Sequence, residues 1–269
     1  MLSYVATIAY LCGAIRQCQT LNTLNMASLD DFFARHQGGN GVAGLHQRLH
    51  SCPELMDFVR HVGFLPLLDS GIPGFDAESL MAEECRYTRF ADGSWEWPLW
   101  QWKGSVVRDG VSLYGKFFAG KAGFVSREWW PDFYNWRRSR HAMPEEGSIE
   151  NTILSTLREQ GSMVARELRA ACGFTGGGAK GSLRSRFDGY VGRLQMACYI
   201  VTEDFVYPTD KHGREYGFGW SLLTTPERLL GREACVCERS PEESWCRMTD
   251  HLARLLPHAT ENQIAKMLQ

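Results

Sequence analysis

The clearest hydrophobic periodicity in this chain lies in its second half. Apolar side chains over residues 149–160 would share one helical face, with Ser148 as the N-cap and Gly161 after the last turn. A second helix is predicted to begin with Ser162 as its N-cap and to end at Gly173. The inward-facing residues are Ile149, Ile153, Leu154 and Leu157 in the first helix, and Val164, Leu168 and Ala171 in the second.

A third helix is predicted to begin near Ser182, after the glycine-rich stretch 175–181. At 100° per residue its apolar side chains fall on one narrow face, which should dock on the first two helices. The opposite face carries Ser185, Gly189 and Gly192. The docking face consists of Leu183, Phe187, Tyr190, Val191 and Leu194.

Two strands are predicted next, over residues 198–207 and 216–224, joined by a long polar turn. A short helix should follow, with Thr225 before Pro226 at its first turn. Three helices followed by a two-stranded wing are the order of a winged helix-turn-helix domain.

The first half of the chain is aromatic-rich and mixes helical and extended patterns. Residues 50–66 favour a short helix that ends near Gly63, and residues 111–126 favour short strands joined by tight turns. Alternation over residues 95–102 indicates extended segments, whereas residues 127–140 favour a helix with a basic end. The predicted fold class is α+β, a winged helix-turn-helix domain plus an aromatic-rich α+β N-terminal domain.

Changes of composition divide the chain into four segments. Residues 1–28 are treated as a leader or a mis-assigned start, because Met26 is a second candidate for the translation start. Residues 29–140 are the predicted aromatic-rich domain, 148–231 the winged-helix domain and 232–269 a helical C-terminal tail. The apolar run near the N-terminus is too short to span a bilayer, so no membrane partner is predicted.

The whole chain carries a formal net charge of −2, so its overall charge does not indicate nucleic-acid binding. Only local clusters of basic residues can support such a function. Residues 103–140 hold eight basic and three acidic residues, and residues 180–193 hold four and one. Cations in and beside these segments could contact phosphates, although each taken singly is more often a solvated surface charge. The candidate nucleic-acid-binding residues are Lys180, Arg184, Arg186, Arg193, Lys211, Arg214, Lys103, Lys116 and Arg127.

Two features allow more than one interpretation. Each glycine inside a helix costs about 1 kcal/mol relative to alanine, so Gly189 and Gly192 indicate that something approaches this helix closely. Protein packing is favoured there over a nucleic-acid backbone. The rings and cations over residues 100–129 are either a surface for unpaired bases and phosphates or an aromatic core with lysines at its edge. The core is favoured, because this segment has few aliphatic residues.

Nine cysteines without framework spacing are typical of a reducing cytoplasm, the predicted location. Cys235, Cys237 and Cys246 with His251 could be drawn as metal ligands, but their spacing matches zinc sites poorly. Dinucleotide, phosphate-loop and metalloprotease motifs are missing from the sequence, so no cofactor or metal is predicted.

Three stretches resemble a known family. They are residues 97–100 with 109–133, FDGYVGRLQ at 187–195 and GWSLLT at 219–224, and YGKFFAGK…SRE is the most specific run. Over residues 52–269 the chain resembles the AlkZ-related proteins, bacterial relatives of the YcaQ-like and AlkZ-like winged-helix DNA glycosylases. The resemblance implies a winged-helix protein that acts on or near DNA.

The longer glycosylases of that superfamily use a Q-x-Q or Q-x-D motif to activate water at a damaged nucleotide. The only Q-x-Q here is Gln17-Cys18-Gln19, inside the segment treated as a leader. Enzyme activity is therefore left open. The leading prediction is DNA binding through backbone contacts, with damaged or single-stranded DNA as candidate targets. The alternatives are a glycosylase for alkylated or cross-linked bases, and an interaction module in which the winged helix packs on the N-terminal domain. The lesion and the oligomeric state are not predicted.

Overall fold

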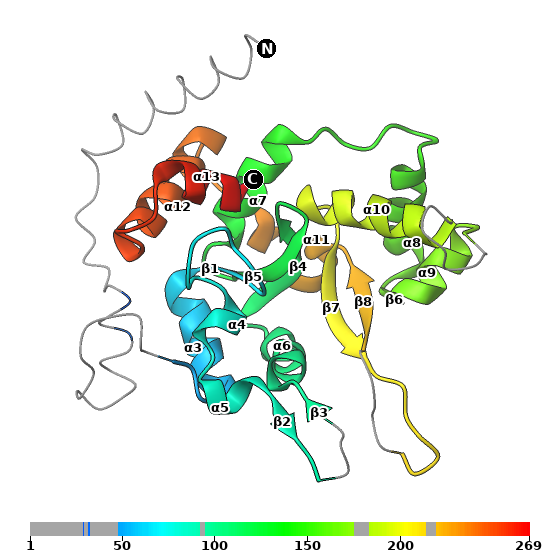
Figure 1. The fold of residues 1–269 in the computed structure, drawn as a ribbon. Helices are drawn as coiled ribbons and strands as arrows, with labels where there is room; N and C mark the ends of the chain where they lie inside the picture. Colours follow the sequence, from blue (N-terminus) through cyan, green and yellow to red (C-terminus); the bar gives the residue numbers. More distant parts are fainter. Residues whose placement is uncertain (1–28, 30–31, 33–47, 92–94, 175–182, 214–218) are drawn as a thin grey trace.

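The computed structural model describes residues 29, 32, 48–91, 95–174, 183–213 and 219–269. Within these residues the chain is an α+β protein with a six-stranded antiparallel sheet in the order β1-β5-β4-β7-β8-β6 (Figure 1). The strands are β1 Phe64–Pro66, β4 Ser112–Phe118, β5 Lys121–Ser126, β6 Met163–Val164, β7 Val201–Val206 and β8 Trp220–Thr224. A separate short hairpin pairs β2 Thr88–Arg89 with β3 Trp95–Glu96.

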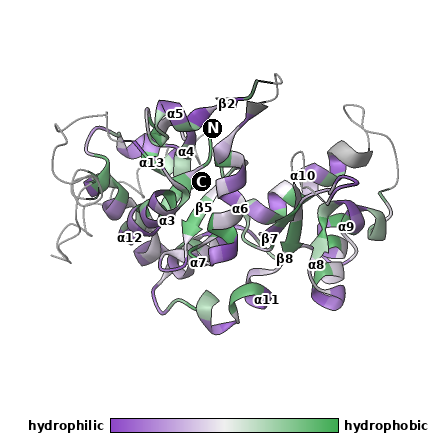
Figure 2. Ribbon diagram, turned by 90° about the horizontal axis from the view of Figure 1, so that it is seen from below, coloured by the Kyte–Doolittle hydropathy of each residue, from purple (hydrophilic) through white to green (hydrophobic). Residues whose placement is uncertain are grey.

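Helices pack around this sheet, and in Figure 2 they alternate between hydrophobic and hydrophilic residues along their length. The helices before residue 141 are α3 Cys52–Val62, α4 Ala77–Leu80, α5 Glu83–Arg86, α6 Pro98–Asp109 and α7 Trp130–Arg140. Those after it are α8 Ile149–Gln160, α9 Ala165–Ala171, α10 Leu183–Met196, α11 Pro226–Leu230, the 3-10 turn η1 Glu233–Cys235, α12 Pro241–Leu255 and α13 Glu261–Leu268.

Several helix ends lie where the sequence predicts them. Ser148 accepts a hydrogen bond from the N–H of Asn151 at 3.1 Å, and Gly161 follows the last turn of α8. The helix α3 ends before Gly63, whose φ of 77° favours glycine. Thr225 caps α11, with proline in the first turn. These local signals are readable because each satisfies a backbone group that the helix leaves unpaired.

The expectation of extended structure over residues 95–102 is wrong beyond Glu96. Pro98 begins α6, and a proline at the first helical position loses no hydrogen bond because that N–H has no intrahelical partner. Trp100 and Trp102 are therefore helical. A run this short is compatible with both periods, so its alternation did not distinguish a strand from a helix.

The prediction that Ser162 caps the second helix is also wrong. Its hydroxyl donates a hydrogen bond to Thr224 Oγ1 at 3.0 Å, and the next two residues form β6, which pairs with β8. The helix α9 begins only at Ala165, and Ala171 is exposed rather than inward-facing. A two-residue strand has no periodicity to read, and its pairing with a distant strand decides the local structure.

The buried apolar residues in the described part of the chain form two hydrophobic cores. The smaller one joins α8, α9 and α10 to β8 through Leu223. The larger one holds the aromatic residues of the first half, and the helices α12 and α13 also pack into it. Trp136 of α7 and Trp245 of α12 lie 4.6 Å apart between ring centroids. The interpretation of Phe117, Phe118 and Trp129 as core residues is confirmed, since all three are buried.

One strand pairing joins the two halves of the protein. Tyr114 of β4 lies opposite Thr202 of β7, so residues 29–140 and 148–231 contribute to one sheet. Figure 1 shows α8, α9 and α10 grouped beside β7 and β8, with α12 and α13 on the opposite side of the molecule. The proposed boundaries between these segments stay a prediction.

His251 of α12 gives the larger core a pH dependence. Its ring is fully buried, stacks on Trp129 and donates a hydrogen bond from Nε2 to the Val62 carbonyl at 3.0 Å. Burial lowers the pKa of His251 to about 4. The unfolded chain binds a proton on this ring below pH 6.5, whereas the folded protein binds it only near pH 4. The contribution of neutral His251 to the free energy of unfolding is therefore complete above pH 6.5 and is lost as the pH falls from 6.5 towards 4.

We expect the free energy of unfolding to fall by about 2 kcal/mol between pH 7 and pH 5 because of this one residue. Urea unfolding at both pH values, compared between the wild type and His251→Gln, measures the effect. Glutamine keeps a donor for the Val62 carbonyl and does not titrate. Equal pH dependence in the two proteins would show that His251 is not held neutral by the fold.

Candidate nucleic-acid interface

The helix α10 docks on the smaller core as its sequence predicts. Phe187, Val191 and Leu194 are buried there, and Tyr190 packs at the edge of the same cluster. The side chain of Leu183 lies outside the described residues. The orientation of α10 is thereby set, with Arg186 exposed on the part of the helix that the core leaves open.

The two glycines of α10 differ in their surroundings. Gly192 is buried, and a Cβ placed there would lie 3.6 Å from Cδ of Lys116 on β4. Gly189 is exposed, and a Cβ there would meet only the Arg193 guanidinium, at 3.9 Å. The Lys116 side chain covers Gly192 at an ordinary contact distance, which would leave room for a methyl group, while the surface at Gly189 stays open. Ser185 lies in α10, but its side chain is not described.

A buried glutamine fixes the C-terminal half of α10 to the sheet. Gln195 Oε1 accepts a hydrogen bond from the backbone N–H of Lys116 at 3.3 Å, and its Nε2 donates to Thr202 Oγ1 at 3.3 Å. Both polar atoms of this buried side-chain amide therefore have a hydrogen-bond partner, as the low dielectric of a core requires. These two hydrogen bonds hold the C-terminal half of α10 on β4 and β7.

The candidate cations near α10 are in different situations. Arg186 and Lys116 are exposed. Arg193 is exposed as well, but it forms an ion pair with Glu150 of α8 at 2.7 Å and lies over the Tyr190 ring. Lys180 and Arg214 lie outside the described residues, as does the side chain of Arg184 within α10.

The β7–β8 hairpin carries another candidate cation. Lys211 is exposed in the turn between the two strands. At the end of the paired strands next to this turn, Val206 pairs with Trp220, and the guanidinium of Arg166 from α9 lies 5.0 Å from the Trp220 ring centroid. Sequence reading missed Trp220 and Arg166, because 54 residues separate them and no motif joins them.

The prediction that Lys103 contacts phosphates is wrong, because this residue does not lie at the surface. The residue is 1% exposed, and its ammonium lies 3.4 Å from the Phe205 ring centroid and 4.6 Å from that of Trp100. Burial lowers the pKa of Lys103 to about 8. In the structure this lysine contacts aromatic rings between α6 and β7, because α6 is a helix whose inner face it occupies.

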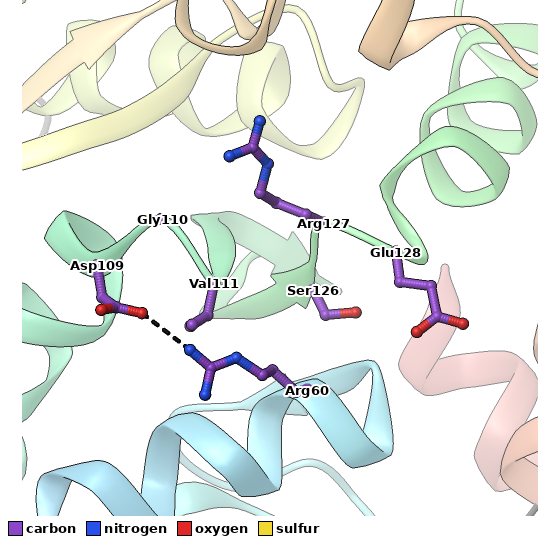
Figure 3. A pocket seen from close by; sticks show the side chains of 7 residues that line it. All are labelled: Arg60, Asp109, Gly110, Val111, Ser126, Arg127 and Glu128. Carbon is purple, nitrogen blue, oxygen red and sulfur yellow. Dashed lines mark hydrogen bonds and ion pairs between the residues drawn. The ribbon is translucent and has the colours of Figure 1, made fainter.

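Arg127 lies between β5 and α7, at the rim of a pocket of about 370 Å³. In Figure 3 its side chain points away from Arg60, which donates hydrogen bonds to Asp57 at 2.6 Å and Asp109 at 3.0 Å. The buried Ser126 hydroxyl also lines the pocket. Two arginines and two acids line it, so the pocket does not select an anion by charge. The full lining is Arg60, Asp109, Gly110, Val111, Ser126, Arg127 and Glu128.

The cysteines near the C-terminus do not form a metal site with His251. Cys237 Sγ lies 3.6 Å from Asp132 Oδ1, while His251 hydrogen-bonds to a backbone carbonyl. Among the described residues, no group of three or more His, Cys, Asp or Glu has the arrangement of a metal site. The Gln17-Cys18-Gln19 motif lies outside the described residues.

None of the helices within the described ranges is long and apolar enough to cross a bilayer.

Comparisons with curated proteins and with solved structures gave no match. A family model described as AlkZ related matches residues 49–269, which is most of the chain and agrees with the resemblance in its sequence. The chain therefore belongs to the AlkZ-related family.

Proposed function

We propose that this protein binds duplex DNA through a winged helix made of α8, α9, α10 and the β7–β8 hairpin. The N-terminal half of α10 and the turn of the hairpin would contact the sugar–phosphate backbone. Membership of the AlkZ-related family supports a role connected with DNA repair.

The observation that carries this proposal is the order of elements. Along the chain they run α8, β6, α9, α10, β7, β8, and the three strands pair in the order β6-β8-β7. A small sheet that closes a three-helix unit in this order is the arrangement of winged helix-turn-helix proteins, in which the last helix and the following hairpin approach DNA. The corresponding helix here is α10.

The residues on the open half of α10 favour contact with phosphates over base reading. Arg186 supplies a positive charge, Asp188 is acidic, and Gly189 has no side chain. Base-specific contacts in the major groove come mostly from Arg, Lys, Asn or Gln that project into it, whereas phosphate contacts carry no sequence information. A bare glycine beside an arginine suits the close approach of a backbone.

The two alternatives have different support. The interaction module is favoured for the C-terminal half of α10, since Gly192 and Gln195 pack against β4. Glycosylase activity has the family as its support, and an excision assay on alkylated or cross-linked duplex tests it. Absence of product at high protein concentration would end that alternative.

The test of the proposal is fluorescence anisotropy with a labelled duplex. We expect Arg186→Glu combined with Lys211→Glu to weaken binding roughly tenfold or more, because both substitutions place a negative charge against phosphates. The control combines Arg254→Glu with Lys266→Glu, which makes the same charge change on α12 and α13. Equal loss in both double variants would contradict the proposed interface and would indicate unspecific attraction by net charge.

A further inference from the structure

The β7–β8 hairpin leaves the central sheet soon after its first strand begins. Thr202 of β7 lies opposite Tyr114 of β4, and the pairing of β7 with β8 shifts register between Thr202 and Asp204. A bulge of this kind bends a strand and increases its twist. Figure 1 shows the hairpin projecting past the sheet, with α6 at its side. Beyond the bulge the hairpin is therefore directed by its contact with α6.

Phe205 and Tyr207 make this contact. Gly104 of α6 lies against both rings, since a Cβ there would be 3.4 Å from the Tyr207 hydroxyl and 3.7 Å from Cδ2 of Phe205. The Tyr207 hydroxyl donates a hydrogen bond to the Trp100 carbonyl at 3.5 Å. Across the hairpin, a Cβ at Gly219 would lie only 3.0 Å from the Tyr207 ring. These contacts of α6 with Phe205 and Tyr207 form what we call the hairpin seat.

Lys103 places a cation inside the hairpin seat. Its ammonium lies 3.4 Å from the Phe205 ring centroid, 4.6 Å from that of Trp100 and 6.0 Å from that of Tyr207. The side chain is almost completely buried, and among the described residues its Nζ has no hydrogen-bond acceptor. Aromatic faces attract a cation, but they replace only part of the hydration that an ammonium has in water. Closing the seat therefore removes water from a charge without supplying an acceptor.

The ionisable groups around Lys103 do not offset this loss. Arg108, on the same helix, repels the ammonium and forms its own ion pair with Asp204 of β7 at 3.7 Å. Tyr114 of β4 stays neutral, because burial raises its pKa. Cys52 of α3 donates its thiol hydrogen to a backbone carbonyl of α6. Burial, with a smaller effect of Arg108, lowers the pKa of Lys103 to about 8.

We propose that Lys103 is a positioning residue that controls how firmly the β7–β8 hairpin is held on α6, with the protonated amine loosening the hairpin seat and the neutral amine tightening it. The turn of this hairpin carries Lys211, so the seat determines how rigidly that cation is presented to DNA. The role in presenting Lys211 rests on the proposed function. The effect of the amine on the seat does not, because it needs no DNA.

The sign follows from the two states of the amine. Its pKa is about 8 in the closed seat and returns towards 10.5 when opening exposes it to water, so protonation favours the open state. The penalty on closing is constant well below pH 8 and decreases above it. The equilibrium constant for opening should therefore fall about tenfold between pH 7 and pH 9 and change little between pH 6 and pH 7.

Hydrogen–deuterium exchange of the hairpin amides, measured on the full chain without DNA, tests the proposal. Lys103→Met keeps an unbranched side chain against the rings but carries no charge. At pH 7 this variant should slow exchange in β7 and β8 by roughly tenfold or more relative to wild type, and this ratio should shrink about tenfold at pH 9. Comparing two proteins at one pH cancels the effect of pH on the intrinsic exchange rate. Lys266→Met removes an exposed lysine of α13 and should match the wild type at both pH values.

An equal ratio at pH 7 and pH 9 would overturn the proposal, because methionine would then act through packing alone. Faster exchange in the variant at pH 7 would overturn it too, since the ammonium would then be holding the hairpin through the rings. NMR of isotope-labelled lysine checks the wild type directly, and a Lys103 amine that titrates at its ordinary pKa would also contradict the proposal. The proposed function fails separately, if the wild-type protein binds no duplex, and that failure would leave the exchange result unchanged.

Discussion

Replacement of Gly63 by alanine is expected to lower the free energy of unfolding by about 4 kcal/mol. Gly63 follows α3 with a φ of 77°, a conformation that costs other residues about 1–2 kcal/mol. A Cβ there would also lie 2.5 Å from Cδ1 of Trp129. That ring cannot move aside, because it is buried and packed between His251 and the Arg247 guanidinium. Overpacking of this kind adds about 1–3 kcal/mol.

Gly71 provides the matched control for this substitution. Its φ of 80° is almost the same, but a Cβ there would meet no atom within 4 Å. Gly71→Ala should therefore lose only the backbone contribution, about 1–2 kcal/mol. Urea unfolding of both variants separates the two effects. Similar losses for the two would contradict the tight packing of Trp129 against Gly63.

Replacement of Asp132 by alanine is expected to cost about 3 kcal/mol. Asp132 lies in the first turn of α7 and is 1% exposed. Its carboxylate accepts hydrogen bonds from Arg247 of α12 and from Arg239 at 3.3 Å. Without it, two guanidinium groups would remain against the core with no buried partner, which is the costly way to break an ion pair. Their partial exposure places the loss at the lower end of the usual range.

Glu128→Ala is the control for Asp132, because Glu128 pairs with the same Arg247, at 3.9 Å, but is largely exposed. Exposed ion pairs contribute at most about 1 kcal/mol, so this variant should be almost as stable as wild type. Thermal unfolding of the two variants is sufficient to compare them. A stable Asp132→Ala protein would show that α12 stays on α7 without this ion pair.

Local signals explain which parts of this fold are readable from the sequence. Ser148 and Gly161 bound α8, and the apolar side chains of α10 face the core, because caps and helical periodicity depend on neighbours within a few residues. The β7–β8 hairpin follows from alternation and a polar turn. Elements fixed by distant partners were misread, as in β6, which exists because β8 lies beside it.

The candidate site was harder to predict than the fold. Lys103 has the sequence context of a surface lysine, and only the packing of Phe205 from β7 above it explains its burial. Gly192 and Gly189 look equivalent in the sequence, yet only the first is covered by Lys116. Arg166 and Trp220, which meet in the fold, are 54 residues apart and carry no shared motif. Such contacts depend on tertiary structure rather than on the spacing of residues.

The salt dependence of duplex binding tests the central claim most directly. If α10 and the β7–β8 hairpin bind phosphates, the logarithm of the association constant must fall linearly with the logarithm of salt concentration. Removing the cations of Arg186 and Lys211 should then reduce the steepness of this line by about 2, close to one for each phosphate that the protein no longer neutralises. A line as steep as that of the wild type, or wild-type binding that does not respond to salt, would contradict the assignment of this surface to DNA.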